Sequence, residues 1–358
     1  MKIGVVFHKD PLAAPDSIDL IRLRAITKGL NASGVETEIL APVPDVVRTD
    51  GGVIVRPVAQ LQRMDYDLVK TCYHFSIDLA SGFDGPIVAR IVRVADDRLP
   101  ERDGAARAEL LRLQAIIASR AACVVVNNPA NARRWRHLYG SRIPVVCVPT
   151  GCPARIPQPA ERNPFESGKK TILFLGSLAA VRMISIINEL ARRCHDVAQV
   201  HIIGLDKTHL YGQNKRLTLD PVVVNHGPMR ETDIWAYIHH AHLGLAIATG
   251  PHPFDNDLSK VWSYLRGGLP VLSESPVLNN PLVRKTGMGL VFRYADMEDM
   301  ATKARRLLDA PPLANKQAAM RLMIEKHSWD CRVKAYIGLF HALHDGVPVS
   351  ARFGYHPV

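Results

Sequence analysis

The stretch PFDNDLSKVWSYLRGGLPVLSESP, from Pro253 to Pro276, predicts a polar loop, a short helix, a glycine turn and a buried strand in succession. Apolar residues recur at helical spacing at Val261, Trp262, Tyr264 and Leu265. Gly267 and Gly268 end the predicted helix, and the strand 269–272 contains Pro270 near its start, where a missing N–H is tolerated. This order of elements is typical of an α/β fold with a parallel sheet.

Lys260 lies in the first turn of the predicted helix. A cation at this end opposes the helix macrodipole, so the position costs free energy unless something compensates. An anion bound at the helix N-terminus would compensate for it. The alternative interpretation is a solvated surface lysine.

The composition is that of a globular protein with a large core. The chain has 358 residues, of which 47% are hydrophobic and 22% charged, enough for two domains of ordinary size. The six cysteines are scattered without metal-ligand spacing, so we expect neither a metal site nor a disulfide framework. No apolar run reaches the roughly 18 residues of a membrane helix, and the apolar run in MKIGVVFHKD is too short for a signal peptide. We therefore expect a cytoplasmic protein.

The net charge of +11 indicates anionic partners, such as nucleic acid, phosphorylated metabolites or an anionic membrane surface. Aromatic residues make up only 6% of the chain and no nucleic-acid-binding motif is present, which argues against nucleic acid. Arginines concentrate between residues 102 and 136, with Trp135 among the last of them. This pattern suits contact with an anionic membrane, and the alternative is a solvated helix face.

The order of elements predicts two doubly wound α/β domains. A strand at 2–8, a helix at 17–31 and a strand at 35–40 open the first. Its later elements include a strand at 86–94 and a helix at 104–120. The Pro-rich stretch 149–169 is a predicted linker, and a strand at 171–175 starts the α/β pattern again. We place an N-terminal domain at 1–155, a C-terminal domain at 156–335, and at 336–358 a helix and tail that pack back on the N-terminal domain.

Gly176 and Ser177 follow the strand 171–175 and precede a predicted helix. A glycine at such a turn lets backbone N–H groups approach a phosphate without a Cβ in the way. Arg182 stands six residues after Gly176. Two cations, Arg182 and Lys260, together with helix N-termini could neutralise a pyrophosphate without a bound metal.

The segment from Lys260 to Leu272 resembles the donor-binding segment K-x-x-E-Y-x-A-x-G-x-P-V-V of glycosyltransferases with the two-domain GT-B fold. Lys260, Tyr264, Gly268 and Pro270 match, whereas Ser263 replaces the second Glu of the Glu-x7-Glu pair of retaining families, whose first position falls on Asp255. The turn at Gly176 is similar to the family's G-R-L-x-x-x-K, with Ser177 at the Arg position and Arg182 at the Lys position. The donor site implied by the resemblance comprises Gly176, Ser177, Arg182, Gly227, Asp255, Ser259, Lys260, Ser263 and Tyr264.

A narrower resemblance involves two segments, 93–97 (RVADD) and 224–244. Both are similar to the bacterial glucuronosyltransferase family of xanthan assembly. That family inverts configuration, uses a UDP-sugar and takes its base from an Asp of the first domain. Here the base would fall on Asp96, with Asp97 as the second choice; the alternative is that Asp96 caps a turn. If the enzyme retains configuration, His74 is the candidate residue for contact with the sugar. The alternative interpretation is that His74 only packs against its neighbours.

The resemblance implies an α/β protein of GT-B type, with two Rossmann-like domains facing a central cleft. It would move a sugar, as a hexosyl- or glycuronosyltransferase, from a nucleoside diphosphate to a saccharide or lipid-linked acceptor. The expected donor is UDP-linked, with no cofactor or metal, and the expected setting is bacterial surface polysaccharide or glycoconjugate synthesis at the inner face of the membrane. The rival functions are a non-catalytic GT-B scaffold that binds nucleotide or glycan and a nucleotide-sugar 2-epimerase, whose cluster of acids and histidines we do not find. The sugar, base, acceptor and stereochemical outcome stay open.

Overall fold

The structure, a computed structural model, describes residues 1–13, 17–49, 51–96, 104–156, 158, 160–166, 168–178, 180–207, 218–252, 256–310 and 315–349. The chain divides into two compact units. The first unit comprises Met1–Gly151 and Ser328–Val358, and the second unit comprises Cys152–His327. The chain thus passes from the second unit to the first between His327 and Ser328, a few residues before the predicted boundary at residue 335.

The first unit is built on an eight-stranded sheet in the order β3-β4-β2-β1-β5-β6-β7-β8. Its strands are β1 (Lys2–Val6), β2 (Glu36–Ala41), β3 (Val47–Arg48), β4 (Ile54–Pro57), β5 (Leu68–Thr71), β6 (Ile87–Ile91), β7 (Cys123–Val126) and β8 (Val145–Cys147). Only the short edge strand β3 runs antiparallel to its neighbour within the described residues. Near-continuous burial of β1, β5, β6 and β7 fits a parallel sheet covered on both faces.

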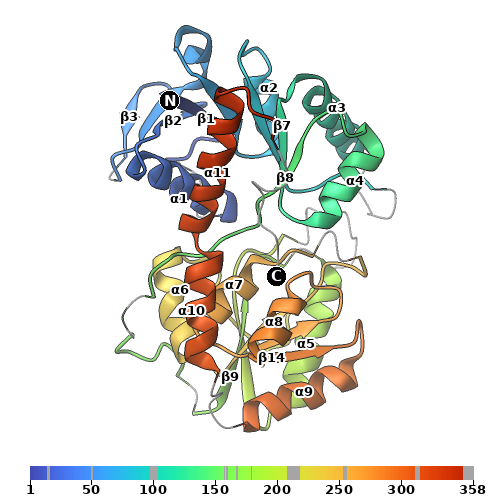
Figure 1. The fold of residues 1–358 in the computed structure, drawn as a ribbon. Coiled ribbons are helices and arrows are strands. Elements are labelled where there is room, and N and C mark those ends of the chain that lie inside the picture. The colour runs from blue at the N-terminus through green and yellow to red at the C-terminus, as the bar shows by residue number, and fades with distance from the viewer. Residues whose placement is uncertain are drawn as a thin grey trace. The chain divides into compact units, whose positions relative to one another are not determined.

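Helices cover both faces of this sheet (Figure 1). They are α1 (Ile18–Ala32), the short 3-10 helices η1 (Val58–Arg63) and η2 (His74–Ser76), α2 (Ile77–Ala80), α3 (Gly104–Arg120), α4 (Pro129–Tyr139) and α11 (Trp329–His344). Helices α1 and α11 pack on one face in a core with β1, and α2, α3 and α4 pack on the other. The last helix of the described chain therefore belongs to the first unit.

The second unit contains a fully parallel six-stranded sheet in the order β11-β10-β9-β12-β13-β14. Its strands are β9 (Lys170–Leu175), β10 (Ala198–Ile203), β11 (Val224–Asn225), β12 (Leu243–Ala246), β13 (Val271–Glu274) and β14 (Gly289–Phe292). The order reverses beside β9, so β9 and β12 flank the topological switch point. In open α/β sheets, ligands bind outside the carboxyl ends of the strands at such a point.

The helices of the second unit also lie on both sheet faces (Figure 1). They are α5 (Val181–Cys194), α6 (Glu231–His240), α7 (Ser259–Arg266), α8 (Asn280–Thr286), α9 (Met297–Asp309) and α10 (Lys316–His327). Helices α5 and α9 pack on one face, while α6, α7 and α10 pack on the other. The two doubly wound parallel sheets confirm the predicted fold class at this level.

Several predicted elements have different bounds in the structure. Strand β6 ends at Ile91, whereas the prediction extended it to Val94, because the apolar run continues into a loop. Strand β13 begins at Val271, after Pro270, rather than at Leu269. Helix α8 and strand β14 were not predicted from the sequence, because their apolar patterns are short.

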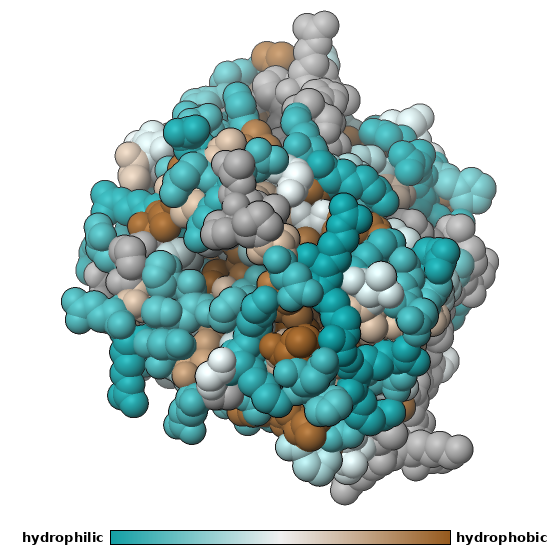
Figure 2. Space-filling model, turned by 90° about the horizontal axis from the view of Figure 1, so that it is seen from below, coloured by the Kyte–Doolittle hydropathy of each residue, from teal (hydrophilic) through white to brown (hydrophobic). Residues whose placement is uncertain are grey.

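The surface drawn in Figure 2 is mostly hydrophilic, and hydrophobic residues show between the polar ones in separate patches. Among the described residues, no helix is both long and apolar enough to cross a membrane. In the same part of the chain, no group of three or more His, Cys, Asp or Glu side chains could hold a metal ion.

Candidate functional site

Glycine turns follow the adjacent strands β9 and β10 at the carboxyl edge of the second sheet. Gly176 has a φ of 103°, in the region that favours glycine. A Cβ at Gly204 would lie 2.1 Å from the carbonyl oxygen of Gly176, so only glycine fits at Gly204. Gly204 in turn donates its N–H to the carbonyl of Gly227 at 2.9 Å, which links the turn after β11 to the same edge. The result is a closely packed backbone edge with little side-chain cover.

Lys260 lies against this edge. A Cβ at Gly176 would lie 3.6 Å from Cε and 3.7 Å from Nζ of Lys260, within van der Waals contact. The ammonium stands 3.5 Å from the centroid of the Phe174 ring, a cation–π contact. Burial lowers the pKa of Lys260 to about 7, with no carboxylate among the causes. The structure therefore brings Gly176 and Lys260 together and leaves the lysine without an acidic partner among the described residues.

An anion would relieve this arrangement. Lys260 is in the first turn of α7, whose N-cap residue Leu258 makes no side-chain capping hydrogen bond. The helix start and the ammonium both favour negative charge. An anion beside Gly176 would meet a cation and the N-terminus of α7.

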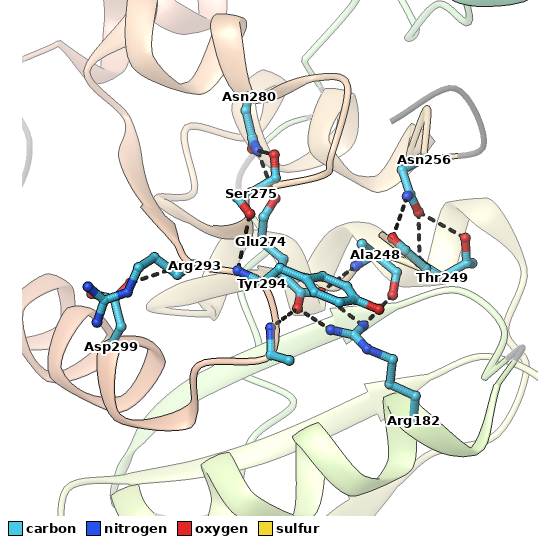
Figure 3. A network of polar contacts seen from close by, with 12 residues as sticks. Arg182, Ala248, Thr249, Asn256, Glu274, Ser275, Asn280, Arg293, Tyr294 and Asp299 are labelled. Atoms are coloured by element: carbon cyan, nitrogen blue, oxygen red, sulfur yellow. Dashed lines mark hydrogen bonds and ion pairs between the residues drawn. The ribbon is translucent and has the colours of Figure 1, made fainter. Parts of the chain in front are cut away.

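Arg182, the second predicted cation, has a partner of its own. It lies in the first turn of α5 and forms a two-point ion pair with Glu274, with Nη1 to Oε2 at 3.0 Å. Nη1 also donates to the carbonyl of Ala248 at 2.7 Å. Its guanidinium lies 4.2 Å from the centroid of the Tyr294 ring, and Figure 3 shows the guanidinium and the Glu274 carboxylate facing each other beside that ring. For Arg182 to contact a diphosphate, it would have to share or leave Glu274.

Glu274 is a residue that the sequence analysis missed. It ends β13 and is fully buried. Besides the Arg182 contacts, its carboxylate accepts the N–H of Ala248 at 3.0 Å and the N–H of Ala295 at 2.9 Å. One carboxylate thus joins the start of α5 and the loops after β12 and β14 (Figure 3). The sequence shows only an acidic residue directly after a predicted buried strand. An acidic residue at that position is equally compatible with an exposed turn.

Asn256 holds the loop that leads into α7. It is fully buried, and its side-chain oxygen accepts the N–H of Thr249 at 2.7 Å. Its amide nitrogen donates to the carbonyls of Gly250 at 2.9 Å and of His252 at 2.8 Å. The loop is therefore shaped from inside by one amide. Asp255, the predicted partner of Ser263 in a Glu-x7-Glu pattern, lies outside the described residues.

The remaining predicted donor residues differ in exposure. Tyr264 is fully buried, and its hydroxyl accepts the N–H of Leu175 at 2.8 Å and donates to the carbonyl of Leu173 at 3.0 Å. This position indicates that Tyr264 supports the end of β9 from within the core. Ser177, Ser259 and Ser263 are half-buried, as is Gly227. Nothing in the structure assigns these four residues a ligand.

In the first unit, His74 belongs to an aromatic group at the carboxyl ends of β1 and β5. Its ring lies 4.2 Å from that of Tyr73 and 4.3 Å from that of Phe75, and His8 packs 5.4 Å from Phe75. Burial, followed by the neighbouring His8, lowers the pKa of His74 to about 3. His74 is therefore neutral near pH 7, and its Nδ1 has no hydrogen-bond partner among the described residues.

Asp96, the predicted base, is buried in a loop beyond the end of β6. Its Oδ2 lies 3.1 Å from Nε of Arg134 on α4, and the same Nε donates to the carbonyl of Ala95 at 3.1 Å. Asp96 is thus not at a strand tip, and in this conformation it faces a guanidinium. Asp97 lies outside the described residues.

The arginine-rich region does not present Trp135. This side chain is fully buried and packs 4.3 Å from Tyr139, so the expectation that it interleaves with arginines on a membrane-facing surface is wrong. The reason is that α4 turns its apolar side toward the sheet. Arg112 pairs with Asp78 and Glu109, and Arg120 donates to the carbonyl of Phe83. Arg112 and Arg120 thus interact with groups of the first unit itself.

Comparison with protein families and with curated proteins finds no match to the sequence. Comparison with solved structures finds many. Sucrose-phosphate synthase from Thermosynechococcus elongatus superposes with a TM-score of 0.72 at 14% identity, covering 96% of this chain and 99% of that one. HepE from Anabaena, in complex with UDP and glucose, gives 0.71 at 14% identity, covering 96% and 100%.

The catalytic domain of starch synthase IV from Arabidopsis thaliana, bound to ADP and acarbose, gives a TM-score of 0.67 at 12% identity and covers 96% of this chain and 99% of that one. At these identities the likeness concerns the fold. Together with the two doubly wound units, it shows that this chain has the GT-B fold of glycosyltransferase structures.

Proposed function

Starting from this GT-B fold, we propose that the protein is a glycosyltransferase that moves a sugar from a nucleoside-diphosphate sugar to a saccharide or lipid-linked acceptor. The observation that carries the proposal is Lys260, held over Gly176 at the start of α7 without a carboxylate partner among the described residues. Glycosyl transfer requires stabilisation of the departing diphosphate, and a preorganised cation beside bare backbone meets that requirement.

The donor is proposed to be UDP-linked and the transferred group a hexose or a glycuronic acid. Two neighbours support a nucleotide donor, since HepE is in complex with UDP and glucose and starch synthase IV is bound to ADP and acarbose. Neither neighbour decides the base for this chain. No cofactor is proposed, because Lys260 and the N-terminus of α7 already offer positive charge to a diphosphate.

Asp96 is proposed as the base of an inverting reaction, with Asp97 as the second choice. Asp96→Asn should lower the transfer rate by a factor of about 10² to 10⁴, whereas UDP affinity should stay unchanged, because the base acts on the acceptor. For Asp96 to act, its contact with Arg134 must open toward the acceptor. Full activity in Asp96→Asn and Asp97→Asn would favour a retaining reaction, with His74 beside the sugar.

The proposed setting is the synthesis of a bacterial surface polysaccharide or glycoconjugate, at the cytoplasmic face of the membrane. With Trp135 buried, contact with anionic lipid would rest on exposed arginines such as Arg133 and Arg136. Co-sedimentation with vesicles should then require anionic lipid and decline with added salt. Equal binding to neutral vesicles would reject this part of the proposal.

The donor site is tested by calorimetric titration with UDP and with UDP-sugars. Lys260→Met should weaken UDP binding by about 1.5–3 kcal/mol, which is roughly a 10- to 100-fold rise in Kd. Lys285→Met, a charge-matched change at an exposed position near the end of α8, should leave Kd unchanged. Equal affinities in the parent and both variants would remove Lys260 from the site.

A second candidate function is a non-catalytic scaffold that binds nucleotide or glycan. It is favoured by Ser263 in place of the family's Glu and by the engagement of Arg182 with Glu274. The two functions differ in turnover. A transferase releases UDP from a UDP-sugar when an acceptor is supplied, whereas a scaffold binds the same ligand and releases none.

A further inference from the structure

Three cations are buried together in the first unit, between the sheet and the helices α1 and α11. Arg22 of α1 is 4% exposed, Lys70 of β5 is 2% exposed and Arg90 of β6 is 1% exposed. Lys70 and Arg90 point to the same sheet face, because Lys70 pairs with Val88 and Arg90 follows two residues later. We call Arg22, Lys70 and Arg90 the buried cation cluster.

Tyr336 of α11 connects the cluster. Its hydroxyl lies 3.3 Å from Nη1 of Arg90, and the ammonium of Lys70 lies 5.0 Å from the centroid of its ring. Burial alone would raise the pKa of Tyr336, but Lys70, Arg90 and Arg22 together lower it below its ordinary value. The phenol therefore senses the positive field of all three cations.

The hydrogen bonds of the cluster go mainly to neutral acceptors. Arg90 Nη1 donates to the carbonyl of Val148 at 3.1 Å, and Lys70 Nζ donates to the carbonyl of Thr71 at 3.2 Å. Arg22 Nη1 pairs with Asp19 at 2.8 Å, and the Asp19 side chain is 28% exposed. The charge of Asp19 acts on both Arg22 and Arg90. Among the described residues, the three positive charges of the cluster thus have one partly solvated negative charge beside them.

Three side-chain nitrogens of the cluster have no hydrogen-bond acceptor among the described residues. Nε and Nη2 of Arg90 and Nε of Arg22 are buried and make no hydrogen bond to the described residues. Buried polar groups in folded proteins nearly always have a partner, and a buried charge left unpaired strongly destabilises the fold. Positive charge and unpaired hydrogen-bond donors at one place favour an acceptor that carries negative charge.

We propose that the buried cation cluster holds a small inorganic anion, with Arg90 as its principal ligand and Arg22 and Lys70 completing the charge balance. Such an ion would connect β5, β6 and α1, and through Tyr336 also α11. Its expected role is to stabilise the first unit. The site is separate from the donor site, which belongs to the second unit.

The first experiment measures thermal unfolding of the full chain at constant ionic strength, with chloride or phosphate replacing gluconate, which is too large for an enclosed site. At anion concentrations above the Kd, each tenfold increase in the concentration of the anion that binds should raise Tm by about 3 to 5 °C. Arg90→Met and Lys70→Met should remove most of this dependence. Arg112→Met, which removes an exposed arginine paired with Asp78, should keep it.

The same titration in Lys260→Met separates this site from the donor site. If the cluster binds the anion, the Tm dependence persists in Lys260→Met even when UDP binding is lost. Crystals grown with bromide should show an anomalous peak within hydrogen-bond distance of the Arg90 guanidinium. The choice between chloride and phosphate follows from which salt shifts Tm at the lower concentration.

Two results would overturn the proposal. One is a Tm that is the same in gluconate, chloride and phosphate, with no bromide peak at Arg90. The other is tyrosinate absorbance near 295 nm at pH 7 that disappears in Tyr336→Phe, since Tyr336 would then supply the negative charge itself. Because Arg90→Met replaces a charge by an apolar chain, Lys70→Met serves as the second variant if the first does not fold.

Discussion

The two units bury arginine in opposite ways. In the second unit, Arg182 meets the fully buried carboxylate of Glu274, which also accepts two backbone N–H groups. In the first unit, the partly exposed Asp19 pairs with Arg22, and three side-chain nitrogens of Arg22 and Arg90 have no acceptor among the described residues. The charge of Arg182 is balanced within the protein, whereas the described residues balance the charges of Arg22, Lys70 and Arg90 only in part.

This difference distinguishes cations that the protein already neutralises from cations that we propose to bind an anion. A guanidinium that is already neutralised gains little from a new anion, whereas an unmatched one gains the whole interaction. By the same criterion Lys260 is comparable to the buried cation cluster, because burial alone shifts its pKa and no carboxylate opposes that shift. Arg182 belongs with the cations that are already neutralised.

The largest effect is expected at Glu274. Glu274→Gln removes the charge but keeps the shape, so Arg182 is left unpaired, and the free energy of unfolding should drop by about 3–5 kcal/mol. Urea unfolding measures the change. The double variant Glu274→Met with Arg182→Met should recover much of the loss, because neither partner is then left charged. A single variant as stable as the parent would show that the pair contributes little.

The next effect concerns Lys260 and pH. Only its ammonium attracts a diphosphate, and its pKa in the free protein is about 7, so UDP affinity should decline as pH rises from 7 to 9, by up to roughly 50-fold. Lys260→Arg, which stays charged, should bind with a flat profile over this range. Calorimetry in buffers of different ionisation enthalpy should also detect proton uptake on binding. A flat profile in the parent would contradict the lowered pKa.

The same lysine affects stability in the opposite direction. Its folded-state pKa lies below the 10.5 of the free side chain, so between about pH 7 and pH 10.5 the unfolded chain binds more protons than the folded one. Stability should therefore rise with pH through this window. Lys260→Met should lack that rise, and Lys285→Met should retain it.

A smaller effect is expected at His74, which is buried as the neutral form. Its folded-state pKa is about 3 against 6.5 when free, so the unfolded chain binds the extra proton between these values and stability falls as pH drops below 6.5. At pH 5 the loss due to His74 should be about 2 kcal/mol. His74→Phe should flatten this part of the profile, whereas His137→Gln, at an exposed position, should not. Identical acid sensitivity in His74→Phe would mean that His74 takes up its proton without cost.

The smallest effect is expected for UDP binding by Arg182→Met. Because Arg182 is neutralised by Glu274, its loss should raise the Kd for UDP by less than tenfold, clearly less than Lys260→Met does. Titration calorimetry of both variants at pH 7 provides the comparison. Equal losses would show that Arg182 leaves Glu274 for the diphosphate, which restores the assignment made from the sequence.

The sequence alone was sufficient for elements with a strong local signal. The helix 104–120 has its predicted bounds, and the helix that carries Lys260 follows from apolar residues at helical spacing. Glycine turns after buried strands predicted the bare backbone edge at Gly176. These features depend on residues that are close in the sequence, within one or two helical turns, so the sequence itself contains the information.

The tertiary structure decided which partners the charged residues have. Arg182 meets Glu274 from 92 residues away, and Arg90 reaches Tyr336 from 246 residues away. No local pattern distinguishes a cation that will find a carboxylate from one that will not, because strand order and helix packing determine which side chains meet. The same reason hid the burial of Trp135 and the pairing of Asp96 with Arg134. Local periodicity determined where the backbone elements lie, whereas packing between distant elements determined which charges remain open to a ligand.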